Sequence, residues 1–86
     1  AVDLDQSQLA QRVRSAASEI VPAEAIHSVH VWQDGTAWSA SVHYSLPGSM
    51  SLTKAHTLSR RLEDRMRERI AGLQRVVIHT EPREEG

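Results

Sequence analysis

The chain has 86 residues, of which 40% are apolar and only 3% aromatic, and it contains no cysteine. This length suffices for one small domain, and the lack of cysteine excludes disulfides and thiolate metal sites. The formal net charge of −1 argues against a generic nucleic-acid binder, and no apolar run is long enough for a membrane span. A core built mainly from small aliphatic residues favours support from a metal ion or an oligomer.

A helix is predicted over residues 6–21, where apolar residues recur at three- and four-residue spacing. Asp5 is expected as its N-cap, with Gln8 three residues on as the second half of a capping box. Pro22 is expected to stop the helix.

Two strands of a hairpin are predicted next. Residues 26–33 are rich in β-branched side chains and precede Asp34-Gly35, a hairpin turn signal. Residues 37–46 alternate between apolar and polar side chains, and the polar set contains three serines and His43. This alternation is typical of a strand with one buried and one open face.

The second half of the chain predicts a helix and a third strand. The helix covers residues 52–70, with Ser51 as N-cap and Gly72 as its stop. The strand covers residues 75–81 and is expected to end at Pro82. The order α-β-β-α-β predicts an α+β open-faced sandwich of the ferredoxin-like or metallochaperone-like type. Its three-stranded sheet carries both helices on one face and leaves the other face uncovered.

Four histidines and one glutamate are candidate metal ligands on converging elements. His79 and Glu81 are two residues apart on one strand, so their side chains leave the same face. A three-residue loop over residues 34–36 puts His27 opposite His43, whereas a two-residue Asp34-Gly35 loop puts them on opposite faces.

His56, near the start of the second helix, is expected to point past the sheet edge. His30, three residues after His27, is expected to face away from it and is the least certain ligand. The alternative for every one of these histidines is a solvated or capping side chain.

The ordered motifs IHSVHVWQDG, ASVHYSL, KAHTLSRRLEDRM and VVIHTEP resemble the cytoplasmic C-terminal domain of cation diffusion facilitators, which are dimeric exporters of divalent metals. The resemblance implies that the metal ligands are His27, His43, His56, His79 and Glu81. Two departures from the family pattern lower the local negative charge: Ser28 replaces a frequent Asp, and residues 47–50 contain no carboxylate.

The resemblance also implies a function. We expect residues 6–82 to form a metal-binding regulatory domain, residues 1–5 a linker from a preceding segment, and residues 83–86 a flexible tail. Zn²⁺ is the metal that the domain is expected to bind, and Fe²⁺, Mn²⁺, Co²⁺, Ni²⁺ or Cd²⁺ are the alternatives. It is expected to work as a homodimer on the cytoplasmic side of a membrane, with the transmembrane domain of the same transporter as partner.

Three other functions are alternatives. The first is a stand-alone metal-binding protein of the same fold in the cytoplasm. Nucleic-acid binding is disfavoured because the predicted open face of the second strand carries serines and His43 rather than paired aromatic residues. An enzyme is disfavoured because no nucleophile–base pair can be recognised in the sequence, and no catalytic residue is predicted.

Overall fold

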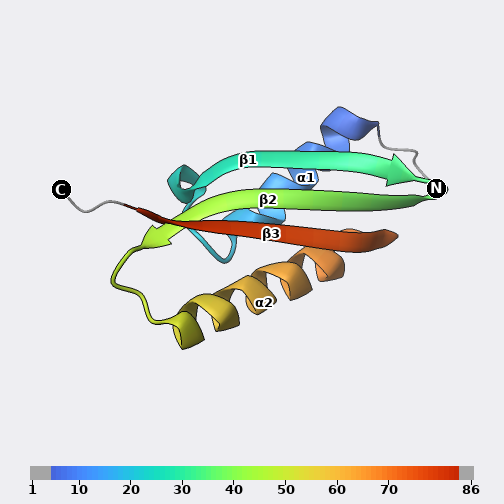
Figure 1. Cartoon of the computed structure of the whole chain (residues 1–86). Coiled ribbons are helices and arrows are strands. Elements are labelled where there is room, and N and C mark those ends of the chain that lie inside the picture. Colours follow the sequence, from blue (N-terminus) through green and yellow to red (C-terminus); the bar gives the residue numbers. More distant parts are fainter. Residues whose placement is uncertain (1–4, 84–86) are drawn as a thin grey trace.

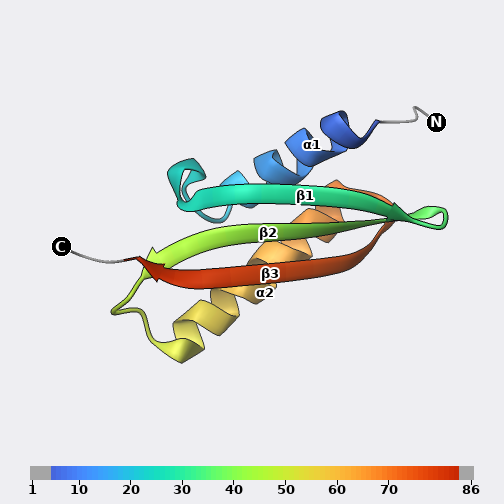
Figure 2. The same cartoon turned by 45° about the horizontal axis from the view of Figure 1, so that its top comes forward.

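The structure is a computed structural model that describes residues 5–83. The elements follow the order α1 (Gln6–Ser18), a short 3-10 turn η1 (Ala23–Ala25), β1 (Ile26–Asp34), β2 (Ala37–Pro47), α2 (Leu52–Arg69) and β3 (Leu73–Arg83). Both helices lie on one face of a three-stranded sheet, and the other face is open (Figures 1 and 2). The predicted α+β open-faced sandwich is therefore confirmed. The predicted linker and tail, apart from Asp5 and Arg83, lie outside the described residues.

The central strand is β2, which pairs antiparallel with β1 and parallel with β3. The side chains of Ala40, Val42 and Tyr44 point toward the helices and are completely buried. The opposite face of β2 carries Ser39, Ser41, His43 and Ser45, as the alternation predicted. Within residues 5–83, neither helix is long and apolar enough to cross a membrane.

Helix α1 begins as predicted, with a capping box formed by Asp5 and Gln8. It ends at Ser18, earlier than the predicted residue 21, because the chain tightens into turns in which the amides of Glu19 and Ile20 donate to the carbonyls three residues before them. The following proline disfavours helical backbone in the residue before it, so the helix cannot continue up to that point.

Strand β3 is longer than predicted at both ends, and the expected stop at Pro82 is wrong. The strand begins at Leu73 and continues through Pro82 to Arg83, which pairs with Pro47 of β2. Proline is tolerated here because β3 is an edge strand, where an amide donor can be absent on the side away from the ladder.

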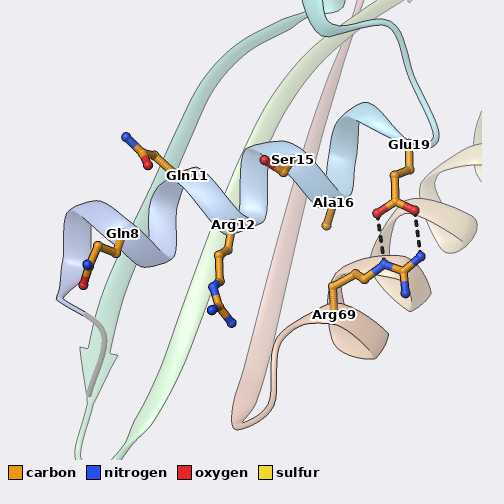
Figure 3. A pocket seen from close by; sticks show the side chains of 7 residues that line it. All are labelled: Gln8, Gln11, Arg12, Ser15, Ala16, Glu19 and Arg69. Atoms are coloured by element: carbon orange, nitrogen blue, oxygen red, sulfur yellow. Dashed lines mark hydrogen bonds and ion pairs between the residues drawn. The ribbon is translucent and has the colours of Figure 1, made fainter. Parts of the chain in front are cut away.

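Two polar contacts fix α2 against the rest of the domain. The hydroxyl of Tyr44 lies 2.8 Å from the hydroxyl of Ser59, which links the central strand to the middle of α2. At the other end of the helix, Arg65 and Arg69 both donate to the carboxylate of Glu19, which follows α1. Figure 3 shows the contact between Arg69 and Glu19. The carboxyl-terminal end of α2 is thus tied to α1. The amino-terminal end extends beyond this contact.

Candidate metal centre

Three of the predicted ligands share the open face of the sheet. His43 of β2 pairs with His79 of β3, and Ser45 of β2 pairs with Glu81 of β3. Residues paired in a sheet point to the same side, so His43, His79 and Glu81 all leave the face that carries no helix. The two-residue spacing of His79 and Glu81 produces this arrangement, as predicted.

A β-bulge brings His27 to the same place. The hairpin turn consists of Gly35 and Thr36, so Ser28 rather than His27 pairs with His43. Neither predicted loop is therefore correct. The register shifts between Ile26 and Ser28, and the extra residue places the ring of His27 5.6 Å from the ring of His43. A bulge re-aims a side chain in this way because two residues of one strand oppose one residue of the other.

The closest contact in the cluster joins an imidazole to a carboxylate. Nε2 of His43 lies 3.3 Å from Oε1 of Glu81, and the ring of His79 is centred 6.5 Å from that of His43. Two donors bound to one tetrahedral zinc ion are separated by roughly 3.3 Å, because each lies about 2.0–2.1 Å from the metal. The His43–Glu81 pair therefore already has the spacing of two zinc ligands.

The remaining donors are near this pair without being gathered around it. Within residues 5–83, no three His, Asp or Glu side chains form a ready-made metal site. The side chains of His43 and Glu81 are 38% and 55% exposed, so a metal ion can reach both and both have room to turn. The residues fit a divalent metal in donor type and location, and a complete set of ligands requires movement or donors from another molecule.

His56 does not join the cluster. It lies on the second turn of α2, the helix that covers the opposite face of the sheet, and its side chain is exposed. Its flank of the helix also carries Arg67, which donates to the carbonyl of Gln74 in the edge strand β3. The helix that carries His56 is thus held against β3, on the other face of the sheet from His43. That the side chain of His56 points past the sheet edge stays a prediction.

His30 faces the same side as the cluster, contrary to the prediction. It pairs with Ser41, which lies on the open face two residues before His43. The prediction assumed regular alternation between His27 and His30, and the bulge breaks that alternation. No glycine occurs in the strand 26–34 to signal a bulge, so the sequence carried no local sign of it.

The sequence pattern described as the cytoplasmic domain of cation efflux proteins matches residues 6–83. The chain belongs to this family. The family predicted from the sequence motifs, that of the cation diffusion facilitators, is confirmed, and with it the assignment as a cytoplasmic domain. The proteins of this family transport cations, and the family is not known to contain enzymes.

Solved structures of C-terminal domains of such transporters share the fold of this cation efflux domain. A MamM C-terminal domain has 14% sequence identity and a TM-score of 0.82, over 93% of this chain and 100% of that chain. The cadmium form of another MamM variant has the same identity, TM-score and coverage. The metal-bound C-terminal domain of the CzcD transporter from Thermotoga maritima has 25% identity and a TM-score of 0.71, over 92% and 94% of the two chains. Among curated protein sequences, none matches this chain.

Proposed function

We propose that this cation efflux domain senses divalent metal ions and regulates transport by closing a homodimer. The observation that carries the proposal is the His43–Glu81 pair, 3.3 Å apart on a sheet face that no helix covers. His27 and His79 flank this pair and supply the further donors. The cadmium and metal-bound forms of the related domains support the same chemistry.

The donor set favours zinc. Neutral imidazole nitrogens and one carboxylate suit Zn²⁺, and they also accept Fe²⁺, Mn²⁺, Co²⁺, Ni²⁺ or Cd²⁺. His43 would hold the ion through a neutral imidazole nitrogen, and Glu81 would supply a carboxylate whose negative charge offsets part of the charge of the ion. Zinc is therefore the first metal to test.

The incomplete ligand set of one chain supports a homodimer, in which a second copy supplies donors. His56 lies on the helix that covers the opposite face of the sheet, so a second copy of the domain is the proposed source of this ligand for a metal at His43 and Glu81. A metal that takes ligands from both copies binds the closed dimer more tightly than the open one, and this difference in affinity drives closure. In the proposed full transporter, closure of the dimer biases the membrane helices toward transport.

Calorimetric zinc titrations of the wild type and of a His43→Ala/His79→Ala double variant test the metal site. We expect zinc affinity to fall at least about 100-fold in the double variant, because two ligands are lost. Ser41→Ala, on the same face of β2, serves as the control and should bind like the wild type. Equal zinc affinity of the double variant and the wild type would refute the proposed site.

A further inference from the structure

The strand β1 forms one outer edge of the sheet, with a neighbouring strand only on the side of β2. Its own residues lack the features that usually keep such an edge from pairing with another chain. Residues 26–33 contain no proline, glycine, Asp, Glu, Lys or Arg, and they are rich in β-branched side chains. A strand of this composition pairs readily with a further strand unless another part of the molecule covers its edge.

Two side chains of α1 reach this edge. Nε2 of Gln6 lies 2.5 Å from the carbonyl oxygen of Val31 and donates to it, and Nη1 of Arg14 donates to the carbonyl oxygen of Ile26 over 3.3 Å. The amino-terminal part of α1 extends past β1 in both views of the domain (Figures 1 and 2). The helix therefore occupies two hydrogen-bonding positions of the strand.

The two occupied carbonyls belong to the same set of residues of β1. In an antiparallel edge strand, alternate residues turn their amide and carbonyl groups away from the partner strand. Ile26, Val29 and Val31 pair with alternate residues of β2, so these three form one set in spite of the bulge. Since Arg14 and Gln6 bond to the first and the last of them, we take this set to be the one that faces the free edge.

Val29 lies between the two occupied positions. It lines a hollow of about 440 Å³ between α1 and β1, together with Gln6 and Ala10 of the helix. A strand that paired with Val29 and continued by one more step in either direction would have to displace Gln6 from Val31 or Arg14 from Ile26. The two side chains thus block any pairing longer than a single step.

The opposite edge of the sheet is protected differently. There β3 contains Pro82, which has no amide donor, and Arg67 of α2 donates to the carbonyl oxygen of Gln74 over 3.1 Å. Part of the protection of β3 is therefore present in the strand itself. The protection of β1 comes from the side chains of α1.

We propose that Gln6 and Arg14 keep the free edge of β1 closed to strand pairing with β1 of a second copy of this chain. A second copy is the fitting partner because two β1 strands related by a twofold axis are antiparallel and present the same outward groups to each other. The inference concerns an interaction surface separate from the metal centre, and it does not depend on metal binding.

The test compares Gln6→Ala/Arg14→Ala with Gln11→Ala/Arg12→Ala. Each double variant replaces one exposed glutamine and one exposed arginine of α1, so the changes in charge and intrinsic helix propensity are the same. Gln11 and Arg12 line the pocket of Figure 3 instead of the edge of β1. Sedimentation velocity of the whole chain, with EDTA present, measures species larger than the wild-type assembly.

We expect the association constant of these larger species to rise at least about tenfold in Gln6→Ala/Arg14→Ala, because two hydrogen bonds that compete with strand pairing are lost. The control should stay within about twofold of the wild type. Hydrogen exchange followed by mass spectrometry should show new protection in residues 26–34 of the associated species. Circular dichroism should show the native fold in both variants.

Each outcome decides the inference without touching metal sensing, because the experiment contains no free metal. A folded Gln6→Ala/Arg14→Ala variant with the wild-type sedimentation profile would overturn it. Equal association of both variants, or new protection outside residues 26–34, would also overturn it. If circular dichroism shows that the double variant is unfolded, Gln6→Ala with Gln11→Ala as its control gives the same decision.

Discussion

Glu19 and Glu81 are two carboxylates of this domain with opposite surroundings. Glu19 receives hydrogen bonds of 2.8 and 3.0 Å from Arg69 (Figure 3). It also receives one of 2.6 Å from Arg65. Glu81, near the end of β3, contacts the imidazole of His43 at 3.3 Å. Glu19 is held by two guanidinium groups, which are permanently charged. Glu81 instead contacts a histidine, a side chain that can bind either a proton or a metal ion.

The two surroundings favour different roles: Glu19 forms a structural ion pair, whereas Glu81 is a proposed metal ligand. Arg69, aided by Arg65, lowers the pKa of Glu19 from 4.5 to about 2, so this carboxylate is ionised and fully engaged at neutral pH. A metal ion would have to displace both arginines to bind there. At Glu81 it has to replace only a single histidine contact. The two glutamates should therefore respond differently to substitution.

The largest expected difference is in zinc affinity. Glu81→Gln removes a negatively charged ligand, so we expect zinc binding to weaken about 10- to 100-fold at pH 7.5. Glu19→Gln, the same chemical change at the other carboxylate, should leave zinc affinity within about twofold of wild type. Isothermal titration calorimetry measures both. Comparable losses in the two variants would mean that net charge, rather than a specific site, determines zinc binding.

The second difference is in the response of metal binding to acid. Protons compete with metal ions for imidazole nitrogens in the range of about pH 5–8 in which histidines generally titrate. Zinc affinity should therefore fall at least about tenfold between pH 7.5 and pH 5.5, while the Glu19–Arg69 pair remains intact. Titrations at three pH values check this. Affinity that stays flat across the range would indicate that carboxylates, not histidines, bind the metal.

Most of the fold and part of this site could be predicted from the sequence. The apolar periodicity of both helices and the strict alternation of β2 determine which faces are buried, and the spacing of His79 and Glu81 placed both on one face. The position of His27 could not be derived, because it depends on a bulge and a turn whose register is set by pairing with β2. The same bulge reversed the expected direction of His30.

The third prediction concerns assembly of two copies around the proposed metal site. We expect a homodimer with and without zinc, and a smaller radius of gyration with zinc, measured by small-angle X-ray scattering. A ligand that binds only the folded state adds about 2.7 kcal/mol of stability at 100 times its Kd, so the melting temperature should rise by several degrees.

Two results would contradict this picture in different ways. A monomer in both conditions would remove the regulatory mechanism. A dimer whose shape does not change would leave metal binding intact but exclude closure. The latter would favour the alternative of a stand-alone metal-binding protein.

The smallest expected effect is that of Glu19, and it concerns the stability of the fold rather than metal binding. Because the pKa of Glu19 is lowered to about 2 in the folded chain, its ion pairs stabilise the fold above about pH 4.5, and this contribution is lost as the pH falls toward 2. Glu19→Gln should therefore melt slightly below the wild type at pH 7, and the difference should disappear near pH 2. High salt should also reduce the difference at pH 7, since exposed charges are screened. Differential scanning calorimetry of both proteins at the two pH values provides the measurement. A gap of constant size from pH 7 to pH 2 would show that the glutamate stabilises the contact between α1 and α2 by packing and not by its charge.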